Sequence, residues 1–183
     1  MIGSSFVVWT AGDETAAACV ELWVAAVAAR DGAPAPAAVR DRALAKFAAE
    51  RVALVVVDDG APDDGTADDG VPDGHGWSLA GFALVTAPGS AGDPAPTDAA
   101  YLSLLAVAPG AQGHGLGRRL LSEAVAAAAA AGYPRCELHA LDGNEPAVSL
   151  YRSAGFTPSA ESFPHAVSGR PTRTWSTTAG QVR

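Results

Sequence analysis

The chain has 183 residues, which suits one domain with one hydrophobic core, and its composition is that of a globular protein. The formal net charge of −8 argues against nucleic acid as a general partner, because phosphates repel an acidic surface. Cys19 and Cys136 lack metal-ligand spacing, so we expect buried free thiols and no metal. No secretory leader is visible and the alanine run at 124–131 is too short to span a bilayer, so we expect a cytoplasmic protein without membrane partners.

The first fifty residues predict one strand and two helices. Residues 6–10 are β-branched and aromatic, which is typical of a strand. Asp13 is a preferred N-cap type before a helix over 16–29, whose apolar residues recur at helical spacing. A second helix over 37–50 is expected to turn Leu44 toward the core, together with its other apolar residues.

An Asp/Gly-rich segment at 58–76 separates two predicted strands, at 52–57 and 77–86. Asp-Asp-Gly recurs there every five residues, and charge repulsion with glycine entropy favours a flexible, solvated loop. The alternative is a surface that attracts a cationic acceptor. A calcium site is disfavoured, since no EF-hand spacing is present.

The stretch from 101 to 121 predicts a buried strand, a glycine-rich turn and a helix that ends near 132. Glycines at a helix entrance let the backbone approach a ligand, and the unpaired N–H groups of the first turn suit a phosphate. Arg118 and Arg119 follow at once. The alternative is a tight connection without a ligand. The turn lacks the Gly-Lys-Ser/Thr ending of a P-loop and the Gly-x-Gly-x-x-Gly spacing of a dinucleotide site.

The last third predicts a strand over 136–141, a helix over 144–154 that Gly155 ends, a strand from Phe156 and a final strand over 172–178. Two blocks in this order then resemble a known family. The first matches the acyl-CoA signature Gln/Arg-x-x-Gly-x-Gly/Ala of the GNAT superfamily of acyl-CoA N-acyltransferases, and the second resembles the family's helix after strand five. Their residues here are Gln112-x-x-Gly115-x-Gly117 and Asn144-x-x-Ala147-x-x-Leu150-Tyr151-x-x-x-Gly155-Phe156.

The resemblance implies an α/β (α+β) fold: a single GNAT-like domain over 1–183, with a mixed central sheet of about seven strands flanked by helices. One central pair of strands should be splayed, so that the pantetheine arm of acetyl-CoA enters the gap. Leu105 and Val107 are the candidates to pair with that arm, although plain core packing is the alternative. The implied cofactor-binding residues are Leu105, Ala106, Val107, Gln112, Gly113, His114, Gly115, Leu116, Gly117, Arg118, Asn144 and Tyr151.

Candidate catalytic residues follow from the two proton movements that acyl transfer to an amine needs. Tyr151 occupies the motif tyrosine and is the candidate general acid, although it could instead be a packing residue. Asn144 would either hold the arm or cap its helix. Many relatives place a glutamate where this chain has Ser103, which can only hold a water. Glu137 and His139, two apart on the neighbouring strand, are candidates to act through water, or are structural.

Two functional hypotheses remain at this stage. In the first, the protein is an N-acetyltransferase that moves an acetyl group directly from acetyl-CoA to a primary amine on a small molecule or a protein. In the second, it is a non-catalytic acyl-CoA-binding or regulatory module on the same fold, because fold does not fix chemistry. Tyr151 favours the enzyme, and the absent glutamate keeps the module open. The sequence allows either a monomer or a homodimer.

Overall fold

The computed structural model describes residues 7–58, 78–90 and 96–178. Within them lie four α-helices, two short 3-10 helices and one eight-stranded sheet. The Asp/Gly-rich segment, apart from Asp58, lies outside the described residues. The elements are β1 (Val7–Thr10), η1 (Asp13–Thr15), α1 (Ala16–Asp31), α2 (Ala37–Phe47), β2 (Arg51–Asp58), β3 (Leu79–Thr86), β4 (Ala99–Val107), η2 (Pro109–Ala111), α3 (Leu116–Ala130), β5 (Arg135–Leu141), α4 (Glu145–Ser153), β6 (Thr157–Pro158), β7 (Phe163–Pro164) and β8 (Pro171–Thr178).

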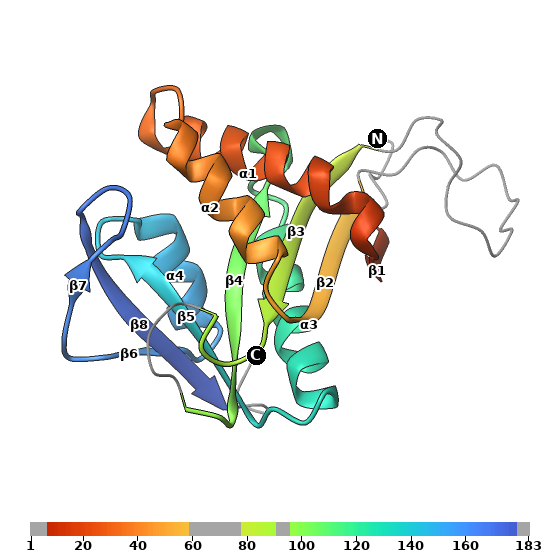
Figure 1. The fold of residues 1–183 in the computed structure, drawn as a ribbon, viewed down its shortest axis with the longest axis vertical. Helices are drawn as coiled ribbons and strands as arrows, with labels where there is room; N and C mark the ends of the chain where they lie inside the picture. Colours follow the sequence, from red (N-terminus) through yellow and green to blue (C-terminus); the bar gives the residue numbers. More distant parts are fainter. Residues whose placement is uncertain (1–6, 59–77, 91–95, 179–183) are drawn as a thin grey trace, which may run out of the picture.

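The strands form one mixed sheet in the order β1-β2-β3-β4-β5-β8-β6, and β7 also pairs with β8. All pairs are antiparallel except the central pair of β4 and β5, which is parallel. Helices α1 and α2 cover one face of the sheet, and α3 and α4 lie behind the other (Figure 1). The expected mixed sheet flanked by helices is therefore confirmed.

Two hydrophobic cores hold these layers together. One lies between the sheet and α3 with α4, and includes Leu120, Leu121 and Phe156. The other lies between the sheet and α1 with α2, and includes Val20 and Phe82. Each of these five side chains is at most 2% exposed, and burying an aliphatic or aromatic side chain contributes about 1.5–3 kcal/mol.

The central strands β4 and β5 separate after a short paired region. They share three residue pairs, the last of which joins Tyr101 to Glu137. Both strands then continue without pairing to each other, β4 to Val107 and β5 to Leu141. The splayed pair that the family resemblance implied is confirmed, and beyond Tyr101 the backbone hydrogen-bonding groups on one edge of β4 face a gap.

A β-bulge in β4 lies beside this separation. Leu84 of β3 pairs with Leu104, while the next residue, Val85, pairs with Leu102, so Ser103 is the extra residue. Because of this extra residue, the side chains on its two sides, two positions apart in the sequence, lie on opposite faces of the sheet. Leu102 packs in the core under α3, and Leu104 packs in the core under α1.

The C-terminus of α4 is closed as the glycine predicted. Gly155 has φ +89°, and its N–H donates to the Arg152 carbonyl at 3.1 Å. The Phe156 N–H donates to the Tyr151 carbonyl at 3.0 Å. This pair of bonds is a Schellman motif, and it ends the helix directly after the turn that carries Tyr151.

Some local predictions were wrong. Asp13 does not cap α1: it lies inside η1, where Gly12 is the N-cap, and its carboxylate pairs with Arg51 at 2.7 Å. Leu44 is 51% exposed, because the helix turns it to solvent, and α2 ends at Phe47, before 50. The two-residue strand β7 was not predicted. Over the described ranges, no helix is long and apolar enough to cross a bilayer.

Candidate active site

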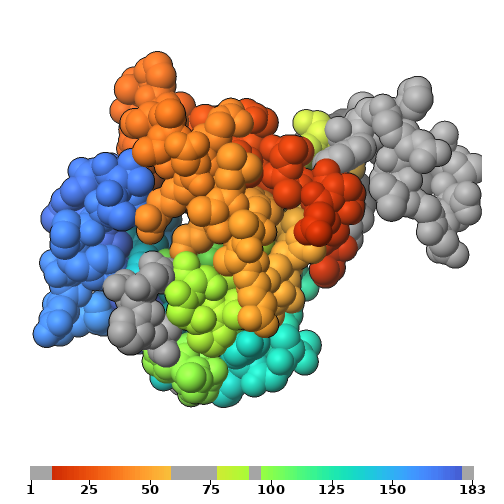
Figure 2. Space-filling model, viewed as in Figure 1, coloured from red at the N-terminus to blue at the C-terminus, as the bar shows by residue number. Residues whose placement is uncertain are grey.

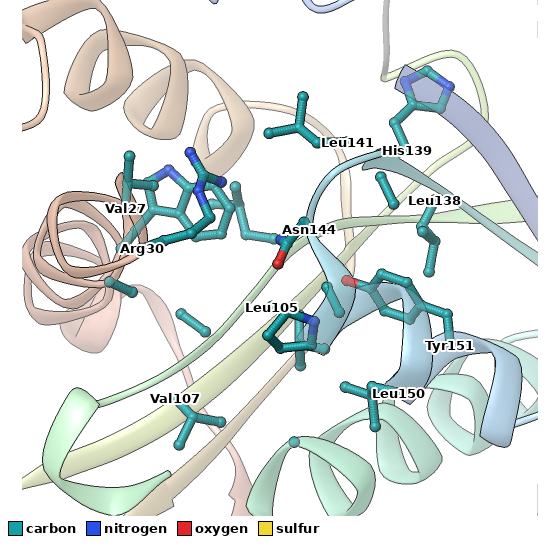
Figure 3. Close-up of a pocket in the computed structure, with 18 of the residues that line it drawn as sticks. Val27, Arg30, Leu105, Val107, Leu138, His139, Leu141, Asn144, Leu150 and Tyr151 are labelled. Carbon is teal, nitrogen blue, oxygen red and sulfur yellow. The ribbon is translucent and has the colours of Figure 1, made fainter. Parts of the chain in front are cut away.

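A cavity of about 1370 Å³ opens where β4 and β5 separate, and α1, α2, α4 and the segment from β7 to β8 complete its walls (Figure 3). Its volume exceeds the roughly 300–1,000 Å³ of a drug-sized site, as a long cofactor plus an acceptor would need. His114 and Glu137 do not line it. The other residues predicted for the site do: Ser103, Leu105, Ala106, Val107, Gln112, Gly113, Gly115, Leu116, Gly117, Arg118, Asn144 and Tyr151.

The glycine-rich turn is held in an open conformation. The Gln112 Nε2 donates to the Val107 carbonyl at 3.3 Å, which ties the turn to the end of β4. Gly113 and Gly115 have φ of +84° and +78°, which side chains disfavour, and a Cβ on either would meet no atom within 4 Å. Gly115 is the N-cap of α3 and no side chain caps that end. The backbone N–H groups there are accessible to an anion.

The third glycine serves packing. A Cβ on Gly117 would lie 3.3 Å from Leu150 of α4 and 3.9 Å from Val107 of β4. Its absence lets α3 and α4 approach each other behind the gap. The Arg118 guanidinium donates to the Ser153 hydroxyl at 3.2 Å, so the cation stays beside the turn.

Tyr151 is 8% exposed and packs by its ring. The ring centroid lies 6.0 Å from that of Phe156 and 6.5 Å from that of Trp175. The hydroxyl makes no hydrogen bond to any residue that the structure describes, and in Figure 3 it points toward Asn144 across the cavity. Burial, with a smaller contribution from Cys136, raises the pKa of Tyr151 to about 12, so the phenol is neutral at pH 7.

Asn144 stands at the N-cap position of α4 without capping it through its side chain. Its backbone carbonyl accepts from the Val148 N–H at 2.9 Å, while the side chain makes no cap hydrogen bond. Figure 3 shows that side chain directed into the cavity. Of the two readings of Asn144, this geometry favours contact with a ligand.

Ser103 lies at the bulge of β4 and lines the cavity. Its hydroxyl is 2.7 Å from that of Thr86 on β3, which in turn donates to the Tyr101 carbonyl at 3.3 Å. Ser103 therefore stands at the position for which the resemblance implied a glutamate, and its hydroxyl, held by Thr86, offers a hydrogen bond but no base.

The two candidates on β5 differ in placement. The Glu137 carboxylate accepts from Arg135 at 3.0 Å, and it lies at the closed end of the splayed pair, outside the cavity lining. His139 does line the cavity. Its ring makes edge contacts with Tyr101 and Phe163, with centroids 5.1 Å and 4.8 Å away.

Sequence reasoning missed Lys46 of α2. This side chain is 8% exposed and lines the cavity. Its ammonium donates to the Ser90 carbonyl at 2.7 Å and lies 4.8 Å from the centroid of the Tyr101 ring. Burial, followed by the charge of Arg42, lowers the pKa of Lys46 to about 8. The available signal was its spacing, three residues after the buried Ala43 and so on the same helix face.

Neither cysteine belongs to the site chemistry. Cys19 and Cys136 are buried free thiols, as predicted, and burial raises the pKa of each to about 12. In the part of the chain that the structure describes, no three His, Cys, Asp or Glu side chains are grouped to hold a metal ion.

Comparison with known sequences defines the class of protein. The profile of the acetyltransferase (GNAT) family matches residues 37–156, which include β4, the glycine-rich turn and α4. The chain belongs to the GNAT acetyltransferase family. A search of curated sequences found no significant match.

Solved structures share the fold. The ribosomal-protein-S18-alanine N-acetyltransferase of Escherichia coli has a TM-score of 0.63 at 20% identity, covering 96% of this chain and 94% of its own. The protein yncA of Salmonella typhimurium, solved with its cofactor acetyl-CoA, has a TM-score of 0.61 at 18% identity and coverages of 96% and 95%. The IAA acetyltransferase of Bacillus cereus has a TM-score of 0.60 at 17% identity and coverages of 95% and 99%. At these identities the likeness concerns the fold.

Proposed function

We propose that this protein is an N-acetyltransferase that moves an acetyl group from acetyl-CoA directly to a primary amine. One observation carries the proposal: the unpaired edge of β4, the open glycine-rich turn and the neutral hydroxyl of Tyr151 border one cavity. The cavity thus offers an edge for an extended arm, an anion-binding turn for a phosphate group and a proton donor near both. Family membership adds independent support.

The residues present fit acetyl-CoA. The backbone of Leu105 and Val107 would pair with the pantetheine arm, because no described strand pairs with that edge of β4 beyond Tyr101. The N–H groups of the turn from Gly113 to Gly117, with Arg118, would hold the pyrophosphate. Asn144 would donate to a carbonyl of the arm. When bound, acetyl-CoA supplies an acetyl group activated as a thioester.

The transfer forms a carbon–nitrogen bond and breaks a carbon–sulfur bond. One proton must leave the attacking amine and one must reach the departing sulfur. We assign the second proton to the Tyr151 hydroxyl, which stays protonated at pH 7 because its pKa is raised to about 12.

For the first proton we assign His139. Of the two β5 candidates it lines the cavity, whereas Glu137 is paired with Arg135 outside it. An imidazole ring nitrogen can accept a proton from an amine or through a water. Ser103, whose hydroxyl is held by that of the buried Thr86, would then orient a water or the acceptor.

The alternative function is a binding or regulatory module that holds acyl-CoA without turnover. Release of free CoA separates the two. The protein with acetyl-CoA and a panel of primary amines should release CoA above the rate without amine, in proportion to enzyme. Tight acetyl-CoA binding with no release from any amine would instead establish the binding module.

A further inference from the structure

The cavity is positively charged in the part bounded by α1, α2 and the segment from β7 to β8. In the space-filling view, the orange α2 and the blue β7–β8 segment face each other across a narrow opening (Figure 2). Asp31 is the only carboxylate among the described lining residues. Four cationic side chains line this part, and we name them the cationic cluster: Arg30, Arg42, Lys46 and Arg170.

Contacts place these side chains near one another. Asp31 accepts from Arg30 at 2.6 Å and from Arg170 at 3.3 Å, so two cations share one carboxylate. The pKa of His165 on the same wall is lowered, by burial first and then by Arg42, Arg30 and Arg170. The charges of α1, α2 and the β7–β8 segment therefore act on one volume, and among the described residues that line it positive charge is in excess.

Lys46 is the deepest member of the cluster. Over 7–58, 78–90 and 96–178 no carboxylate pairs with it, and its one hydrogen bond goes to the Ser90 carbonyl. With a pKa of about 8 it is mostly protonated at pH 7, and an ammonium has three donors. A bound anion would stabilise this buried ammonium by accepting from the donors that the Ser90 carbonyl does not take. Its contact with Tyr101 puts it beside the point where β4 and β5 separate.

We propose that the acetyl acceptor is an amino-acid-like molecule whose carboxylate binds the cationic cluster, with Lys46 and Arg42 as its main partners. This inference rests on the proposed N-acetyltransferase function and names its substrate class. The excess of positive charge disfavours polyamines as acceptors. It also favours the neutral amine of the acceptor, since a nearby cation lowers an amine's pKa and so prepares the nucleophile.

Matched acceptors test the carboxylate. The standard L-amino acids and their carboxamides share the amine and side chain but differ in the anionic group. For the best acceptor we expect kcat/KM to be at least about 10-fold higher for the acid than for its carboxamide. A charge-assisted hydrogen bond in a partly buried site is strong enough to give this difference. Spermidine should be a poor acceptor. An amide equal to or better than its acid, or spermidine as the best acceptor, overturns the inference while leaving N-acetylation intact.

Variants test the named partners. Lys46→Met and Arg42→Gln should each lower kcat/KM for the acid by about 10- to 100-fold and for the carboxamide by less than about threefold. Arg40→Gln is the control on the same helix, because Arg40 pairs with Glu21 and does not line the cavity. It should leave both values unchanged. Equal losses for acid and amide in both variants would overturn the assignment, and Arg42→Gln decides it if Lys46→Met fails to fold.

A binding measurement separates this inference from the proposed function. Calorimetric titration with the N-acetylated acids and N-acetylated amides should show tighter binding of the acid product to the wild type. The difference should shrink about 10-fold or more in Arg42→Gln. Equal affinity of the two products, or binding of neither, overturns the carboxylate site even without turnover data. Failure of the proposed function appears elsewhere, as absence of CoA release from every amine.

Discussion

The hydroxyl of Tyr151 can be removed with little damage to its surroundings. Tyr151→Phe keeps the ring between Phe156 and Trp175, and the hydroxyl makes no hydrogen bond to a described residue that would be lost. We therefore expect the melting temperature to change by only a few degrees. Affinity for acetyl-CoA should hardly change either, because the donor is needed mainly in the transition state.

The expected loss of turnover can be estimated from the environment of the phenol. A positioned general acid contributes about 10²- to 10⁴-fold. The pKa of Tyr151 is raised to about 12, well above that of an ordinary thiol at about 8.5, so complete proton transfer to the thiolate is unfavourable. Hydrogen-bond donation to the developing charge then provides much of the stabilisation. We expect a fall in kcat near the lower end, about 10²-fold, or about 2.7 kcal/mol.

The assay compares kcat and KM of the two proteins on an amine that the wild type acetylates. The pH dependence of kcat provides a second test, because it reports the protonation state of the phenol. A phenol whose pKa is raised to about 12 stays protonated through the neutral range, so its deprotonation should not reduce wild-type kcat between pH 7 and 10. A fall below about threefold in Tyr151→Phe would refute the acid assignment. A large rise in KM for acetyl-CoA at constant kcat would make the hydroxyl a binding contact.

Three further predictions address the turn, the base and the Asp/Gly-rich segment. Acetyl-CoA at a hundredfold excess over Kd should raise the melting temperature of the wild type by roughly 5–10 °C. Gly115→Val should remove that shift, since a β-branched residue is strained at φ +78°. His139→Gln should lower kcat about 10²- to 10⁴-fold with little effect from the control Glu137→Gln, and the reverse order would contradict the assignment. Replacing residues 60–74 by a short Gly-Ser linker should leave the melting temperature within a few degrees, because their composition offers little to a core; unfolding would disprove this.

Much of the fold was predictable because its signals are local. The apolar run of β4, the turn glycines and the helix after them follow one another in the sequence, and the positive φ of Gly113 and Gly115 explains why those residues are glycines. The Schellman glycine Gly155 likewise marks the end of α4. Where short-range sterics decide the structure, residue type and spacing were sufficient.

The rest depends on contacts between distant segments. Glu137 and His139 have the same strand parity, yet only the point at which β4 and β5 separate decides which of them reaches the cavity. In the sequence alone, Lys46 resembles any solvent-exposed lysine. Its burial depends on the packing of α2 over Tyr101. Asp31 pairs with both Arg30 and Arg170, which lie far apart in the sequence, and no sequence pattern predicts that pairing.

The extra residue in β4 separates two properties of this strand, namely the faces of its side chains and its local bend. Replacing Ser103 leaves the count of residues unchanged, so Leu102 and Leu104 keep their separate cores. Deleting it would make Leu102 and Leu104 consecutive residues on opposite faces, so pairing with β3 would run on without a bulge and both side chains would keep their cores. The bulge thus governs the local bend and twist of β4 next to the point where it leaves β5, and not the core that each side chain joins.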